Sequence, residues 1–135
     1  MKLTMVVVAG SMIFLAMQAK TTQDGVYTEA QATRGEAVYG KACASCHGPS
    51  LDGDGQAPPL AGKEFEEEWK GAPLSDLFER IRVTMPGDAP GTLKPAEVAN
   101  VMAYLFSRAK FPAGPSELSS DVAALKAITF MAPAR

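Results

Sequence analysis

The fold of this chain is decided by five consecutive residues, Cys43-Ala44-Ser45-Cys46-His47. The chain has 135 residues, and its two cysteines and single histidine all fall within these five positions. The spacing C-x-x-C-H is the attachment signature of c-type haem. Two thiols at this spacing bond to the haem vinyl groups, and the adjacent imidazole becomes the proximal iron ligand. We therefore expect one covalent haem c, held by Cys43 and Cys46, with His47 on the iron.

Other chemistry uses the same residue types. A zinc site needs about four ligands, whereas the cysteines and the histidine together number three. A thioredoxin-like dithiol would be expected in a βαβ context, which the pattern described below does not contain. A structural disulfide across two intervening residues suits an exported chain, but it gives no reason for His47. These readings remain as weaker alternatives to haem attachment.

Residues 1–19 have the pattern of a secretory signal peptide. Lys2 precedes the apolar run Leu3–Met17, and no acidic residue occurs before Asp24. A basic start, an apolar stretch and a small residue near its end are typical of export signals, so we expect cleavage after Ala19. An uncleaved anchor is the alternative, although the run is shorter than the ~20 apolar residues of a spanning helix. The expected location is the periplasm, without stable membrane insertion after cleavage.

Composition limits the remaining function classes. Apolar residues make up 47% of the chain and charged residues 21%, which is typical of a globular protein. The formal net charge of -2 provides no basic field for nucleic acid, so none is expected as a partner.

We divide the chain into the signal peptide, a polar linker at 20–27, a domain at 28–110 and a C-terminal extension at 111–135.

Apolar residues at the spacing i, i+3, i+4 predict an all-α protein. The predicted helices cover residues 28–43, 64–70, 74–84 and 94–111, and a weaker one covers 120–128. The first begins at Thr28-x-x-Gln31, which has the pattern of a capping box. The last has Val122, Leu125 and Ile128 as its apolar positions. Loops as long as 48–63 are uncommon in compact domains unless they are functional.

The second axial ligand is expected to be a methionine, because the chain has no second histidine. Outside the export segment, the methionines are Met85, Met102 and Met131. Met102 belongs to the apolar stripe of a strongly patterned helix, and Met131 lies in a proline-bounded tail. Pro86 moves Met85 out of helical geometry, so this side chain can project from a loop. We predict Met85 as the ligand, with a methionine filling a core gap as the alternative.

From residue 28 to 106 the chain resembles the class I cytochromes c. Gly35 and Tyr39 match the glycine and aromatic residue of that family's first helix, and Val101 and Tyr104 match the pair on its last core helix. Glycine permits close approach where the two helices cross. The resemblance implies the cytochrome c fold, with about four to five helices and long loops wrapped around one covalently bound haem.

The resemblance also implies roles around the haem. Pro58 matches the proline whose carbonyl accepts the second imidazole N–H, and Leu60 would pack on the haem edge. Trp69 aligns loosely with an aromatic residue that donates to a haem propionate, with simple core packing as the alternative. Arg80 and Arg82 each stand close enough before the methionine to pair with a propionate, although arginines on a helix face are more often solvated.

A narrower resemblance is to the small cytochromes that accompany quinoprotein dehydrogenases. Thr84-Met85-Pro86 and Phe111-Pro112-Ala113-Gly114 are among the matching pieces. An iron held by His47 and Met85 leaves no site open to a substrate, so we expect an electron carrier rather than an enzyme, and this resemblance implies that it passes single electrons from a dehydrogenase to the respiratory chain. Its partners would be redox proteins, such as a quinoprotein dehydrogenase and a terminal oxidase or another cytochrome. One departure is Lys94, which stands where that group has a Ser or Thr helix cap, a loss of about 1 kcal/mol.

Two other functions remain open. An enzyme or gas sensor would need an open iron site, and hence Met85 away from the iron, with a distal acid or base that the chain does not obviously supply. A haem-bound subunit of a larger complex is the other alternative. The segment 118–135 keeps it open, because it lies beyond the core resemblance and could cover a partner.

Overall fold

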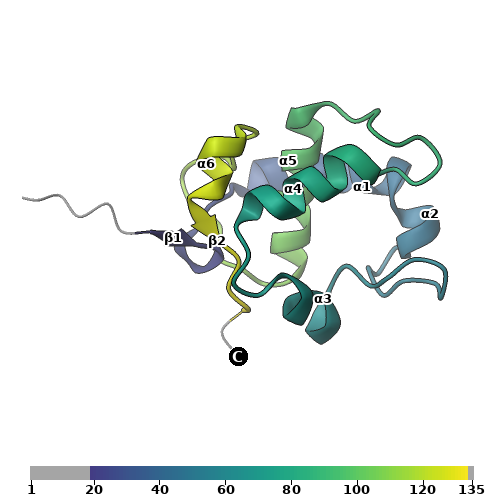
Figure 1. The fold of residues 1–135 in the computed structure, drawn as a ribbon, viewed down its shortest axis with the longest axis horizontal. Coiled ribbons are helices and arrows are strands. Elements are labelled where there is room, and N and C mark those ends of the chain that lie inside the picture. The colour runs from purple at the N-terminus through teal and green to yellow at the C-terminus, as the bar shows by residue number, and fades with distance from the viewer. Residues whose placement is uncertain (1–18, 134–135) are drawn as a thin grey trace, which may run out of the picture.

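A computed structural model describes residues 19–133 of the chain (Figure 1). Its elements are β1 (Lys20–Thr21), the 3-10 helix η1 (Thr22–Asp24), α1 (Glu29–Ala42), α2 (Ala44–His47), α3 (Gly62–Trp69), α4 (Leu74–Thr84), α5 (Pro95–Arg108), α6 (Val122–Lys126) and β2 (Ile128–Thr129). The predicted all-α class is confirmed. Apart from Ala19, the expected signal peptide lies outside the described residues. Within residues 19–133, no helix is long and apolar enough to cross a membrane.

The two longest helices, α1 and α5, cross closely at Gly35. A Cβ atom added to Gly35 would lie 1.8 Å from the backbone oxygen of Asn100, so only glycine fits there without movement. Beside the crossing, the rings of Tyr39 and Tyr104 pack with their centroids 5.2 Å apart. Val101 is buried next to them. The close helix pair implied by the resemblance is therefore present.

Replacing Gly35 tests this crossing. We expect Gly35→Ala to lower the free energy of unfolding by about 3 kcal/mol, because the added methyl forces two helix backbones apart. Gly40→Ala is the matched control on the same helix, since its Cβ would meet nothing within 4 Å. That variant should gain roughly 0.5–1 kcal/mol from helix propensity. Urea denaturation followed by circular dichroism measures both, and equal effects of the two substitutions would contradict this account.

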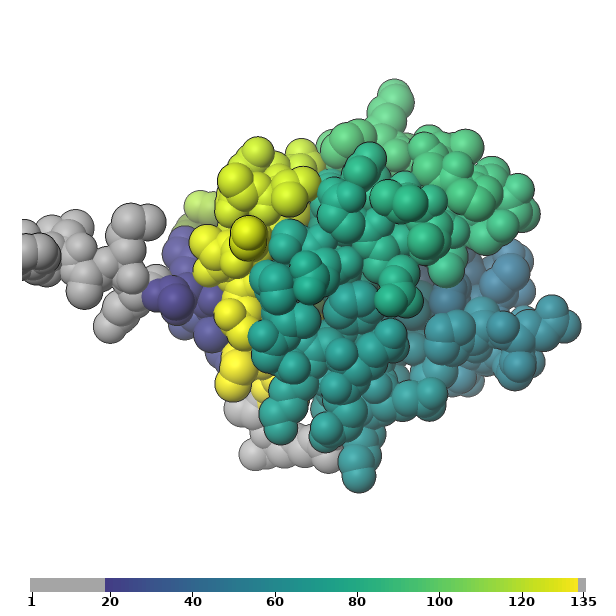
Figure 2. All heavy atoms as spheres, viewed as in Figure 1, coloured from purple at the N-terminus to yellow at the C-terminus, as the bar shows by residue number. Residues whose placement is uncertain are grey.

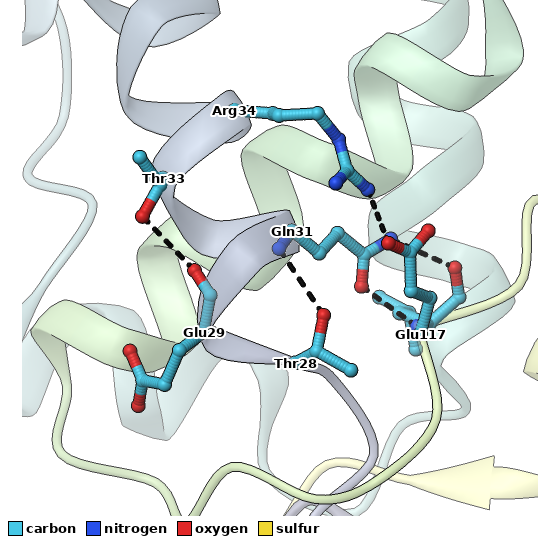
Figure 3. A network of polar contacts seen from close by, with 7 residues as sticks. Thr28, Glu29, Gln31, Thr33, Arg34 and Glu117 are labelled. Carbon is cyan, nitrogen blue, oxygen red and sulfur yellow. Dashed lines mark hydrogen bonds and ion pairs between the residues drawn. The ribbon is translucent and has the colours of Figure 1, made fainter.

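The capping box predicted at the start of α1 is half wrong. Thr28 does cap the helix, because its hydroxyl accepts the Gln31 N–H at 3.1 Å. The Gln31 side chain does not return to Thr28. It donates to the Leu118 carbonyl at 2.9 Å and accepts the Leu118 N–H at 2.7 Å, while Arg34 pairs with Glu117 on the surface (Figure 3). A buried primary amide can satisfy both polar groups of an extended backbone, and that tertiary contact replaces the local one.

Residues 20–27, expected to be a linker, pack against the C-terminal segment. The Tyr27 hydroxyl donates to the Phe111 carbonyl at 2.8 Å, and the Gly114 N–H donates to the Tyr27 carbonyl at 2.7 Å. β1 pairs in parallel with β2, with Lys20 opposite Ile128. Figure 2 shows the C-terminal residues in yellow, lying between the N-terminal segment and the teal surface of α4. The extension therefore folds back on its own domain.

The last helix is shorter than predicted. Asp121 begins α6, because its carboxylate accepts the Ala124 N–H at 2.9 Å. Leu125 is fully buried, and α6 packs on α4. Val122, the first of the three predicted apolar positions, is 43% exposed and does not contribute to the core. Ile128 has already left the helix and pairs in β2, because the parallel contact with β1 competes for its backbone.

The start of α5 compensates for the missing Ser or Thr cap. The Lys94 side chain makes no capping bond, but the Glu97 carboxylate accepts the Lys94 backbone N–H at 2.8 Å. Pro95 is the first helical residue, where its missing N–H costs nothing. Acidic charge in the first turn also favours the helix dipole. The N-terminus of α5 is therefore stabilised without a Ser or Thr cap.

Candidate functional site

The signature residues lie where α1 gives way to α2. The Cys43 N–H still bonds to the Tyr39 carbonyl at 2.9 Å, and the Cys43 carbonyl accepts the His47 N–H at 2.9 Å. This break turns the chain, so that one short helical turn carries the rest of the signature. Cys43 and His47 are buried, whereas Cys46 is exposed, and both thiols are free. Burial raises the pKa of the Cys43 thiol to about 11.

A cavity of about 370 Å³ opens beside α2, walled by α3, α4, α5 and two loops. Its volume falls within the ~300–1,000 Å³ typical of ligand and cofactor pockets. Every side chain that the sequence analysis assigns to a haem site lines this one cavity: Cys43, Cys46, His47, Pro58, Leu60, Trp69 and Met85. Phe65, Leu77, Ile81 and Leu105 add apolar wall that the sequence analysis did not assign to the site. Seven positions spread over 43 residues of sequence thus converge in space.

The imidazole of His47 is oriented by the loop beneath it. Its Nδ1 lies 2.8 Å from the carbonyl oxygen of Pro58, the contact that the resemblance implies. A carbonyl can only accept, so Nδ1 carries a proton, and in the neutral imidazole the lone pair is then on Nε2. Such a bond fixes the ring and strengthens it as a metal donor. Within this loop the Leu60 N–H donates to the Leu51 carbonyl at 2.8 Å, which holds Pro58 in place.

Tyr39 ties α1 to the residue that follows His47. Its hydroxyl donates to the Gly48 carbonyl at 2.6 Å. The ring is buried, and burial raises the pKa of Tyr39 to about 12. The backbone at the end of α2 is therefore anchored to α1 by a side chain that stays protonated at neutral pH.

Tyr39→Phe should lower the free energy of unfolding at pH 7 by about 1 kcal/mol, the typical net value of one hydrogen bond. Because the folded pKa lies above the ordinary value of 10, Tyr39 contributes stability that is complete below pH 10 and lost as the pH rises toward 12. The variant should therefore lose less stability across this window. Denaturation at several pH values measures it, with Tyr104→Phe as control. Parallel pH profiles for wild type and Tyr39→Phe would refute the prediction.

Met85 adopts the extended conformation predicted from Pro86, with φ -117° and ψ 154°. Its N–H closes α4 on the Ile81 carbonyl at 3.0 Å, and its side chain lines the cavity. Met102 is fully buried in α5, and Met131 is 41% exposed. Among the methionines of residues 19–133, only Met85 lines the cavity with His47.

The comparison with known families agrees with this geometry. The family model described as Cytochrome C oxidase, cbb3-type, subunit III matches residues 30–105, which run from α1 into α5. The chain belongs to this family of c-type cytochromes. No match was found among curated proteins or among solved structures. Membership indicates a haem c protein with a function in electron transfer.

The residues of this cytochrome fit haem c chemically. Two thiols, an imidazole with a free Nε2 and a thioether share one largely apolar cavity. These are the attachment and axial groups that a c-type haem uses. In the part of the chain that the structure describes, no group of three or more His, Cys, Asp or Glu side chains could hold a bare metal ion. The donor set is therefore suited to a haem rather than to a zinc-type site.

The structure of this cytochrome shows which of Arg80 and Arg82 faces the cavity, a choice that the sequence did not decide. The Arg80 guanidinium lies over the Trp69 ring, 5.6 Å from its centroid, and Arg80 lines the cavity. Arg82 instead pairs with Glu79 at 2.7 Å on the exposed face of α4. Trp69 is buried, and its ring packs on Phe65 with the centroids 6.3 Å apart. Of the two arginines, Arg80 is thus the one that faces the site.

Proposed function

We propose that this cytochrome carries single electrons through one covalently attached haem c. Cys43 and Cys46 would form its thioethers, and His47 and Met85 would be its axial ligands. The observation that carries the proposal is the convergence of two thiols, one oriented imidazole and one thioether in a single cavity. When bound there, haem c supplies reversible one-electron exchange between ferric and ferrous iron.

The chain's own residues then have distinct tasks. His47 would bind the iron through Nε2, while the Pro58 carbonyl accepts its Nδ1 proton and sets the ring orientation. Met85 supplies a thioether, which favours ferrous iron and raises the potential. Leu60, Phe65 and Trp69 give the cavity an apolar wall, which would disfavour water around the haem. With His47 and Met85 both holding the iron, no position on it would be left for a substrate, which favours an electron carrier over an enzyme or gas sensor.

The finer proposal is a periplasmic carrier between a dehydrogenase and the respiratory chain. The export pattern at 1–19 supports the periplasm. The resemblance to cytochromes of quinoprotein dehydrogenases supports such an enzyme as donor. The family description names a subunit of a terminal oxidase, which supports an oxidase, or another cytochrome, as acceptor.

The same family description favours a second candidate, a resident subunit of an oxidase complex. The C-terminal segment bears on this choice, because it covers its own domain through Phe111, Leu118 and Phe130 and is not free to wrap a partner. A free carrier therefore has the stronger support. A pull-down from native periplasm separates the two, since a subunit would be recovered in constant ratio with its complex.

The deciding experiment is expression in a host with periplasmic c-haem maturation. Haem should remain with the denatured chain, and the native spectrum should be low-spin, with the weak red band of methionine-to-ferric-iron charge transfer. Covalent haem with a high-spin spectrum would indicate an open iron and move the function to an enzyme or sensor. A chain without covalent haem would overturn the proposal.

A further inference from the structure

The helix α3 needs support from outside itself. It supplies Phe65 and Trp69 to the cavity wall, yet it has only 8 residues. Helices shorter than about 12–15 residues are marginal on their own. Within residues 19–133, α3 has no extensive packing against another helix or strand. It begins at Gly62 and is followed by Gly71, which have φ +80° and +82°, where the chain turns sharply.

The support comes from residues 128–131, which we call the C-terminal strap. The Gly71 N–H donates to the Phe130 carbonyl at 2.9 Å, and the Phe130 N–H donates to the Ala72 carbonyl at 2.8 Å. Thr129 also forms an antiparallel bridge with Pro73. The strap therefore fixes the backbone directly after Trp69.

The ring of Phe130 extends this contact into α3. It meets Phe65 edge to face, with centroids 6.0 Å apart and planes at 82°. Phe65 in turn packs on Trp69 at 6.3 Å. Behind it, the fully buried Phe130 is held by Phe111 at 5.5 Å and Phe106 at 6.3 Å. A continuous row of rings thus connects α5 to the cavity wall.

We propose that Phe130 is a positioning residue of the haem cavity, holding α3 so that Trp69 closes the wall opposite the Arg80 guanidinium. The inference rests on the proposed function, and Phe130 lies outside the 30–105 region that the family model matches. Burial and nearby hydrogen-bond donors are two of the levers by which a protein sets a haem potential. Displacement of Trp69 changes both, because water enters and its N–H moves away.

The chain has a single tryptophan, so emission from Trp69 reports its distance from the haem, which quenches it by energy transfer. In the haem-loaded protein, Phe130→Ala should raise Trp69 emission at least two-fold and lower the reduction potential. Phe130→Leu keeps the apolar bulk but loses the ring edge, and it should show smaller changes in the same directions. This second variant also keeps the test decisive if Phe130→Ala does not fold.

Gln31→Ala is the matched control. It loosens the same C-terminal segment at Leu118, 10 residues before the strap and outside its contacts with α3, so its melting temperature should fall while emission and potential stay as in wild type. Unchanged emission and potential in both Phe130 variants, or equal changes in Gln31→Ala, would overturn the positioning role. A wild-type chain without covalent haem would overturn the proposed function. Attached haem with unchanged Trp69 emission in the Phe130 variants would overturn only the positioning role of Phe130.

Discussion

The double variant Cys43→Ala, Cys46→Ala is expected to leave no haem on the denatured chain. Both thiols line the cavity, and the chain has no other cysteine to replace them. Each single variant keeps one thioether and should retain haem in lower yield. A haem-staining gel after denaturation, together with the pyridine-haem spectrum, measures the loss.

Ser45→Ala is the control for these variants, because it changes the signature without changing a thiol. It should attach haem at the wild-type level, since the Ser45 hydroxyl makes only a weak contact of 3.9 Å with the Cys46 sulfur. Haem that survives denaturation in the double variant would mean that another side chain forms the bond. That result would contradict the assignment of the signature.

Met85→Ala is expected to remove the red charge-transfer band and convert the ferric spectrum from low-spin to high-spin. The reduction potential should fall, because axial ligands set haem potentials over a range of about 0.8 V. No other methionine of residues 19–133 lines the cavity to replace the thioether. Visible absorption and potentiometric titration of the purified protein measure both changes.

The control is Met102→Leu, which keeps the volume of a side chain buried in α5. Such a swap usually costs less than about 1.5 kcal/mol, and it should leave the band and the potential in place. If Met85→Ala keeps the band while Met102→Leu loses it, the axial ligand is Met102. Met85 would then be the side chain that only fills space.

The centre of the fold could be predicted from sequence because its determinants are local or periodic. The C-x-x-C-H spacing and the proline after Met85 each act within a few residues of themselves, whereas the Gly35 crossing joins two distant helices and was implied by the family resemblance. Pro86 sets the backbone of its own neighbour, so the extended Met85 needed no knowledge of the tertiary structure. The same holds for the buried stripe of α5, which follows helical spacing.

The periphery could not be predicted, because its partners are distant in sequence. Gln31 bonds to a residue 87 positions away, and nothing local distinguishes that contact from a capping box. The residues 20–27 are polar and read as a linker, yet Thr22 and Tyr27 are fully buried against the far end of the chain. Val122 had the right spacing for burial, but the Asp121 cap places it at the exposed start of α6.

The parallel pairing of β1 with β2 joins segments 108 residues apart in sequence. This has a consequence for how the protein is made. Under the proposed export, a chain that crosses a membrane N-terminus first would deliver Cys43–His47 about 80 residues before Ile128, so the haem-attaching machinery would meet a domain whose last strand has not arrived. Contacts of such long range also form late, because loop closure must be completed first. We therefore expect haem attachment to precede the pairing of β1 with β2, which would be the last step in folding of the domain.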